Sequence, residues 1–134
     1  MSIDLPARAE LHELFVYGSL VDPGCLDDVL GHAHQGERLA ARLVGYERRK
    51  TDAFAYSFIV SAAGRSVEGV LIMDLSPCDL RALDRYEDVD AGLYQRRLVE
   101  VEAWGCGQQP LRRCAFVYAA GPGLCSSTYT PHGP

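Results

Sequence analysis

Helix signals occur at only two places in this sequence, and this scarcity restricts the folds that the chain can adopt. Residues 23–30 follow the capping residue Asp22 and end before Gly31, and residues 77–87 follow the capping residue Ser76. Most of the other segments have the apolar character of strands, at 14–17, 39–46, 53–60, 66–73, 94–104 and 113–118. Two helices so far apart are too few for a doubly wound parallel sheet. We therefore predict an α+β fold, with a small mixed, mostly antiparallel, barrel-like sheet and flanking helices.

The length and composition are those of a single globular domain. The chain has 134 residues, of which 48% are hydrophobic and 23% are charged, and this is enough for one hydrophobic core. We expect the domain to span residues 13–120, with a turn at residues 63–65 between two of its strands. Residues 1–12 are expected to form a flexible arm, and residues 121–134, which are rich in Pro, Gly and Ser, a flexible tail.

The charge and hydropathy of the chain argue against several kinds of partner. A net charge of −5 disfavours nucleic acid or an anionic membrane as the main partner. No uncharged run approaches the length of a membrane span. The N-terminus lacks the basic start and apolar stretch of a secretory signal, so we expect a cytoplasmic protein.

The cysteines and histidines do not have the spacing of a metal site. There are five cysteines, an odd number, and no pair has CxxC spacing, so we expect reduced thiols with neither a disulfide framework nor a zinc site. Cys25 and Cys78 fall in the helical segments and could serve as small core residues. His32 and His34 lack supporting ligands, and we expect them to be solvated loop residues.

A carboxylate on the apolar face of the second helix is the first candidate for chemistry. Glu87 follows Leu80 by seven residues, so at about 100° per residue it lies on nearly the same side as Leu80 and Leu83. Burial favours the neutral form of a carboxylate and raises its pKa towards the range that a general base needs. The alternative is an exposed acid at a fraying helix end, and the spacing alone leaves both interpretations open.

The glycine turn after the first strand is a second candidate site. Tyr17-Gly18-Ser19-Leu20 lies where this strand turns towards the first helix. Gly18 permits a tight turn and the close approach of a ligand to the backbone. Consecutive N–H groups at such a turn can bind a carboxylate, and Ser19 adds a hydroxyl group. A plain tight turn without a ligand is the competing interpretation.

Three residues on the last two predicted strands are further candidates. Tyr94 and Arg96 alternate along one strand, so they point to the same side. Arg96 could pair with a substrate carboxylate, or could simply hold an acid such as Glu87 or Asp84. Tyr118 lies late in an apolar strand, where we expect a core aromatic residue whose hydroxyl reaches the site.

Taken in order, these segments resemble the gamma-glutamylcyclotransferase-like family, in particular its small single-domain branch of avirulence-induced-gene-like and gamma-glutamylamine cyclotransferase proteins. The resemblance covers about residues 13–118. The matching segments are Phe15-Val16-Tyr17-Gly18-Ser19-Leu20 with Asp22-Pro23, Val29-Leu30-Gly31, Leu43-Val44-Gly45-Tyr46, Val67-Glu68-Gly69-Val70-Leu71, and Leu83-Asp84-Arg85-Tyr86-Glu87 followed by Tyr94-Gln95-Arg96.

The resemblance implies a cyclotransferase that needs no metal or organic cofactor. Its substrate would be a small γ-glutamyl compound, whose glutamyl end is received by the backbone amides of residues 17–20. Glu87 would be the acid–base residue, with Tyr94, Arg96 and Tyr118 as neighbours in the cavity. The α-amine of the substrate would attack its own γ-carbonyl and release an amine or amino acid as 5-oxoproline forms. The alternative is a non-catalytic module of the same fold that binds a small carboxylate.

Overall fold

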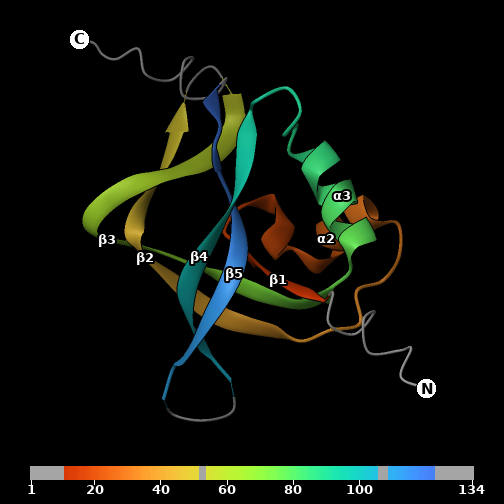
Figure 1. Cartoon of the computed structure of the whole chain (residues 1–134), viewed down its shortest axis with the longest axis horizontal. Coiled ribbons are helices and arrows are strands. Elements are labelled where there is room, and N and C mark those ends of the chain that lie inside the picture. The colour runs from red at the N-terminus through yellow and green to blue at the C-terminus, as the bar shows by residue number, and fades with distance from the viewer. Residues whose placement is uncertain (1–10, 52–53, 106–108, 123–134) are drawn as a thin grey trace.

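Five strands close into a small barrel in the computed structural model of the protein, which describes residues 11–51, 54–105 and 109–122 (Figure 1). The strands are β1 (His12–Val16), β2 (Arg38–Thr51), β3 (Phe54–Leu75), β4 (Tyr94–Trp104) and β5 (Leu111–Ala120). Their order around the barrel is β1-β3-β2-β4-β5, and each neighbouring pair is antiparallel except β1 and β5, which are parallel. This arrangement confirms the predicted α+β class and the mostly antiparallel barrel.

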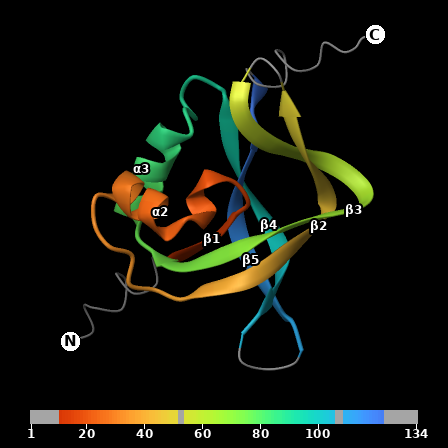
Figure 2. The same cartoon turned by 180° about the vertical axis from the view of Figure 1, so that it is seen from behind.

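Three helical segments connect the strands, namely the 3₁₀ turn η1 (Ser19–Val21), α2 (Pro23–Leu30) and α3 (Pro77–Tyr86). Helix α2 begins where the Asp22 carboxylate accepts a hydrogen bond from the Cys25 N–H at 3.1 Å, and it ends at Gly31, which has a φ of 82°. Helix α3 begins with a reciprocal capping box between Ser76 and Asp79. Both predicted caps are confirmed, and α2 and α3 lie side by side on one side of the barrel (Figure 2).

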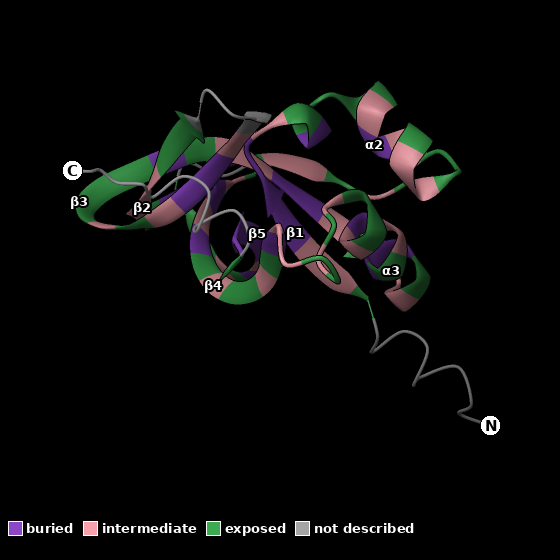
Figure 3. Ribbon diagram, turned by 90° about the horizontal axis from the view of Figure 1, so that it is seen from above, coloured by how far each residue is buried: buried purple, intermediate pink, exposed green. Residues whose placement is uncertain are grey.

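The core consists of two apolar clusters on opposite faces of the sheet. The first cluster draws residues from all five strands and fills the barrel, with Phe15, Leu43, Leu71, Val101 and Val117 among its members. The second packs α2 and α3 against the outside of the barrel, through Leu14, Leu26, Ile72, Leu80 and Leu83. Successive residues of a strand point to opposite faces, so β1 serves both clusters. Figure 3 shows the buried residues gathered on the strands, while the outer turns of α2 and α3 are exposed.

The predicted turn at residues 63–65 is wrong, because β3 runs through it without interruption and joins two of the predicted strands. The register between β2 and β3 shifts opposite this segment, next to Gly45. Gly45 and Gly64 have φ angles of 91° and 81°, in the left-handed region that glycine tolerates best. The glycine at position 64 therefore belongs to an irregularity that bends the paired strands, and it does not end them.

The described strands and their contacts extend slightly beyond the predicted domain boundaries at both ends. His12, which the sequence places in the flexible arm, already belongs to β1. Gly121, the first residue of the predicted tail, is buried, and its N–H donates a hydrogen bond to the Leu93 carbonyl oxygen at 2.9 Å. The rest of the predicted arm and tail, at residues 1–10 and 123–134, lies outside the described residues.

The cysteines in the described part of the chain, Cys25, Cys78 and Cys114, are free thiols. Cys25 is half-buried, but Cys78 is exposed, so the prediction that Cys78 is a core residue is wrong. Cys106 and Cys125 lie outside the described residues. Within the same described ranges, no helix is long and apolar enough to cross a membrane.

Both loop histidines contact protein groups, but His32 is exposed to solvent as predicted, whereas His34 is half-buried and departs from the prediction. His32 Nε2 lies 2.8 Å from the Asp79 carboxylate, which raises the pKa of His32. His34 Nε2 lies 2.6 Å from the Met73 carbonyl oxygen. Across residues 11–51, 54–105 and 109–122, no group of three or more potential metal ligands comes together.

Candidate active site

A cavity of about 300 Å³ opens at one end of the barrel, beside the junction of β1 and η1. All five strands contribute residues to its lining. Strands β1, β2 and β5 contribute near their C-terminal ends, and β3 and β4 contribute near their N-terminal ends. The end of α3 completes the wall. The lining combines apolar, aromatic and charged side chains: Phe15, Val16, Tyr17, Gly18, Ser19, Leu20, Arg48, Lys50, Ser57, Tyr86, Glu87, Tyr94 and Tyr118.

Glu87 lies in the wall of this cavity, at the point where α3 ends. It is the C-terminal capping residue of the helix, and its N–H donates to the Leu83 carbonyl oxygen at 2.9 Å. The side chain is half-buried, and this desolvation raises the pKa of its carboxyl group to about 7, with a smaller contribution from the negative charge of Asp88. A carboxyl group with this pKa exchanges protons readily near neutral pH.

The turn at residues 17–20 forms another part of the wall. Val21 N–H donates to the Gly18 carbonyl oxygen at 3.0 Å, which is the first hydrogen bond of η1. The N–H groups of Ser19 and Leu20 come before this bond in the chain. As in the first turn of any helix, the helical hydrogen bonds give these N–H groups no acceptor. The Ser19 Oγ lies 2.9 Å from the hydroxyl of Tyr86, so the turn is linked to the end of α3. Leu20 is buried and anchors the turn in the core.

Three buried tyrosines line the cavity, and the hydroxyl group of each donates a hydrogen bond to a protein group. Tyr17 donates to the Tyr118 carbonyl oxygen at 2.7 Å, and Tyr94 donates to the Ser57 carbonyl oxygen at 2.6 Å. Tyr118 donates to Asp84 Oδ1 at 2.6 Å. Burial raises the pKa of both Tyr17 and Tyr118 well above the usual range, so these phenols stay neutral. Their donor roles fix the orientation of the rings in the wall.

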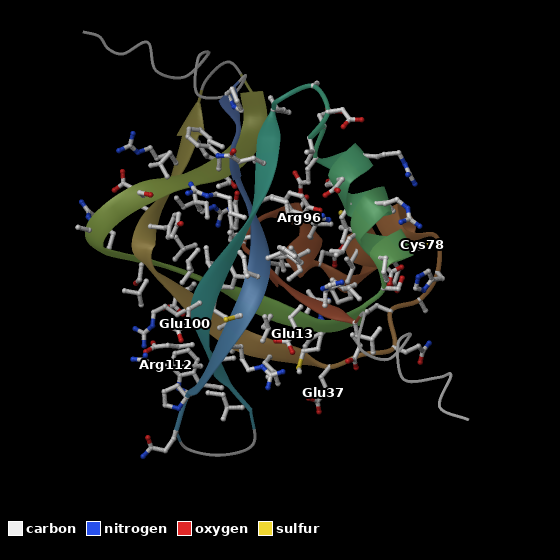
Figure 4. All side chains as sticks on the ribbon, in the orientation of Figure 1. Glu13, Glu37, Cys78, Arg96, Glu100 and Arg112 are labelled. Atoms are coloured by element: carbon white, nitrogen blue, oxygen red, sulfur yellow. The ribbon has the colours of Figure 1, made fainter. Side chains whose placement is uncertain are left out.

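Arg96 lies outside the cavity lining and pairs with Asp84, which is one of the two arrangements that the sequence left open. Its Nη1 lies 3.2 Å from the Asp84 carboxylate, and its guanidinium group lies 4.9 Å from the centre of the Phe116 ring. Figure 4 shows Arg96 between β4 and α3. Asp84 therefore joins Arg96 to Tyr118, and the two charged residues hold a cavity tyrosine in place.

Two basic residues of the cavity wall, Arg48 and Lys50, are absent from the candidates that the sequence suggests. They lie on β2 beyond residue 46, where the predicted strand ends. Because side chains alternate along a strand, these two residues share one face. Extending the predicted strand to residue 51 would have identified them as neighbours of the site. The polar composition of residues 47–51 gives no strand pattern that would justify this extension.

Comparison with known proteins identifies the family. The family model described as "Gamma-glutamyl cyclotransferase, AIG2-like" matches residues 14–132. Among curated proteins, Protein AIG2 C of Arabidopsis thaliana is 34% identical over 90 residues, which are 67% of this chain and 52% of that protein. AIG2-like protein D of the same plant is 28% identical over 109 residues, covering 81% of this chain and 68% of that protein. The chain spans about half the length of most of the curated relatives that it matches.

Solved structures share the fold. A solution structure of an Arabidopsis thaliana protein has a TM-score of 0.68 and 26% identity, and the match covers 86% of this chain and 74% of that one. A structure described as a gamma-glutamyl cyclotransferase has a TM-score of 0.67 and 19% identity, covering 83% of this chain and 67% of that one. The second likeness concerns the fold alone. From the extent of the family match, we conclude that the chain belongs to the AIG2-like gamma-glutamyl cyclotransferase family.

Proposed function

We propose that the protein is a γ-glutamyl cyclotransferase that uses Glu87 as its general acid and base. The observation that carries this proposal is the position of Glu87, a half-buried carboxyl group in a cavity wall, with its pKa raised to about 7. An ordinary Glu side chain has a pKa of about 4.5 and is a weak base at neutral pH. The observed environment removes that obstacle.

The proposed binding site for the α-carboxylate of the glutamyl group is the turn at residues 17–20. In this proposal the adjacent N–H groups of Ser19 and Leu20, two residues of the cavity wall, donate to the carboxylate, which is the natural ligand of such a turn. A carboxylate held there leaves the α-amine within the cavity that Glu87 also lines. The hydroxyl protons of Tyr17 and Tyr118 are engaged in hydrogen bonds to protein groups, so the hydroxyl oxygens can only accept a further hydrogen bond, and an amine N–H suits them.

Ring closure then needs a base and an acid, since the substrate brings its own nucleophile. Once the α-ammonium has lost one proton to solvent, its nitrogen attacks the γ-carbonyl carbon and the Glu87 carboxylate takes a second proton from that nitrogen. The carboxylic acid so formed gives this proton to the leaving nitrogen as the original bond to the γ-carbon breaks. The products are 5-oxoproline and a free amine, and Glu87 returns to its carboxylate form.

The tethered nucleophile explains why a cavity with a single acid–base group would be sufficient. Correct orientation of an intramolecular reaction supplies about 7–11 kcal/mol in favourable cases. The steps as written require neither a covalent enzyme intermediate nor a cofactor. The protein would hold the substrate in a folded conformation and move one proton.

The test is an assay of turnover with γ-glutamyl compounds that carry amino acid, peptide or alkylamine leaving groups. The quantity measured is the rate at which 5-oxoproline forms. We expect Glu87→Gln to reduce kcat by about 10²–10⁴-fold, the range typical of a lost general acid–base group. Asp90→Asn is the matched control, because it makes the same chemical change at an exposed acid just beyond Glu87. For the unaltered protein, kcat/KM should rise with pH through about 7 as Glu87 ionises.

Two results would contradict the proposal. Equal turnover by the Glu87→Gln variant would remove Glu87 from the mechanism. Thermal stabilisation by γ-glutamyl compounds without any 5-oxoproline would instead favour the non-catalytic binding module.

A further inference from the structure

Arg48 and Lys50 place two positive charges on the cavity wall, on the same face of β2. Both residues are exposed to solvent at the rim of the cavity. The guanidinium group of Arg48 lies over the ring of Tyr17, 5.9 Å from its centre, and both residues belong to the cavity wall. The mechanism proposed above uses neither residue.

Among the residues that the structure describes, these two cations differ from Arg49 and Arg65 in that they have no acidic partner. Arg49, between them on the opposite face of β2, pairs with Glu47, and Arg65 also lies within 3.9 Å of Glu47. For Arg48 and Lys50, no carboxylate belonging to residues 11–51, 54–105 or 109–122 forms an ion pair. Two cations at the rim of a cavity, without an ion pair to any described residue, favour an anionic ligand.

The charged residues of the cavity lining come from two different elements. Glu87 and its neighbour Asp88 lie at the end of α3, while Arg48 and Lys50 lie on β2. In the proposed function, the turn at 17–20 and Glu87 serve the glutamyl carboxylate and α-amine. The basic rim is then left for the part of the substrate that departs.

We propose that Arg48 and Lys50 form a subsite for a carboxylate carried by the leaving group. This inference rests on the proposed function, and it specifies the substrate class as γ-glutamyl amino acids or peptides in preference to γ-glutamyl alkylamines. Arg and Lys bind carboxylates through charge-assisted hydrogen bonds, which are stronger than neutral ones. A subsite of this kind would raise kcat/KM for the acidic leaving group by about 10–100-fold.

The experiment compares γ-glutamylalanine with γ-glutamylethylamide, since alanine and ethylamine differ only by the carboxylate. We expect the unaltered protein to prefer γ-glutamylalanine by about 10–100-fold in kcat/KM, and added NaCl to reduce this preference. Arg48→Gln and Lys50→Gln should each lower kcat/KM for γ-glutamylalanine at least several-fold and leave that for the ethylamide nearly unchanged. Arg49→Gln, which changes the same chemistry on the opposite face of β2, should leave the preference intact.

The same comparison can be made without turnover by measuring the affinity of both compounds for the Glu87→Gln variant. The measurement is then repeated on the double variant that also carries Arg48→Gln. Suppose that γ-glutamylalanine binds more tightly than the ethylamide, that Arg48→Gln abolishes this difference, and that the unaltered protein forms no 5-oxoproline. These results together would support the subsite and refute the proposed catalysis. Equal losses for both compounds in Arg48→Gln would place the cations at the shared glutamyl end and overturn the inference. A substrate preference that is absent in the unaltered protein, or that persists in both variants, would also overturn it.

Discussion

Replacement of Glu87 by Gln should make the protein more stable, and the gain should grow with pH. The pKa of this carboxyl group is about 7 in the folded protein, against 4.5 for an unperturbed Glu. Each tenfold change in an acid dissociation constant corresponds to about 1.4 kcal/mol, so ionised Glu87 costs the folded state about 3 kcal/mol. Gln keeps the shape of the neutral acid and cannot ionise.

The pH range of the effect follows from the two pKa values. At pH 4 the carboxyl group is mostly protonated in both the folded and the unfolded chain, so the difference between the variant and the unaltered protein should be close to zero. As pH rises from about 4.5 to about 7, the unfolded chain releases this proton while the folded chain retains it, and the unaltered protein loses stability. Above pH 7 the loss is complete, and the difference should level off at about 3 kcal/mol.

Denaturant unfolding of both proteins at several pH values between 4 and 8 measures this difference directly. Contributions from groups that are unaffected by the substitution cancel between the two proteins. Asp90→Asn controls for the loss of one negative charge at an exposed position, and its effect should not grow with pH in this way. If the stability gain of Glu87→Gln is the same at pH 4 and pH 8, the carboxyl group is not desolvated in the folded state, and the argument for its role as a base fails.

Three further substitutions test how the fold supports the site, each by denaturant unfolding with the unaltered protein as reference. Tyr118→Phe removes the hydrogen bond to Asp84 and should cost about 1.5–3 kcal/mol; an unchanged stability would mean that this bond does not hold the tyrosine. Ser76→Ala removes the side-chain cap of α3 and should cost about 1 kcal/mol, with no cost expected if the capping box does not persist in solution. Gly69→Ala places a Cβ in steric conflict with the Val16 carbonyl oxygen and should cost about 1–3 kcal/mol; a neutral effect would contradict the close approach of β1 and β3.

The features that could be predicted from the sequence are those fixed by neighbours in the chain. Asp22 and Ser76 cap the helices through bonds to residues three positions away, and Gly31 ends α2 by its own conformation. These interactions depend on local spacing, and the sequence displays local spacing directly. The position of Glu87 in a continuous apolar stripe is information of the same kind.

The features that could not be predicted depend on partners far away in the chain. Gly64 reads as a turn because its neighbours give no sign that β2 continues alongside it. Arg48 and Lys50 lie in a polar stretch that becomes a strand only through pairing with β3. The choice of Asp84 as the partner of Arg96 depends on how α3 packs beside β4, and the alternation along β4 carries no information about that packing.

The parallel contact between β1 and β5 determines when the cavity can exist. Leu14 of β1 pairs with Phe116 of β5, and the hydroxyl of Tyr17 donates a hydrogen bond to the backbone of Tyr118, 101 positions later in the chain. Both tyrosines belong to the wall. Because β5 is synthesised last, the cavity wall can be completed only after the whole domain has been synthesised, and no substrate could be bound before then. Shortened chains that end before β5 should be inert rather than weakly active, and ligand binding would report the completion of the entire domain.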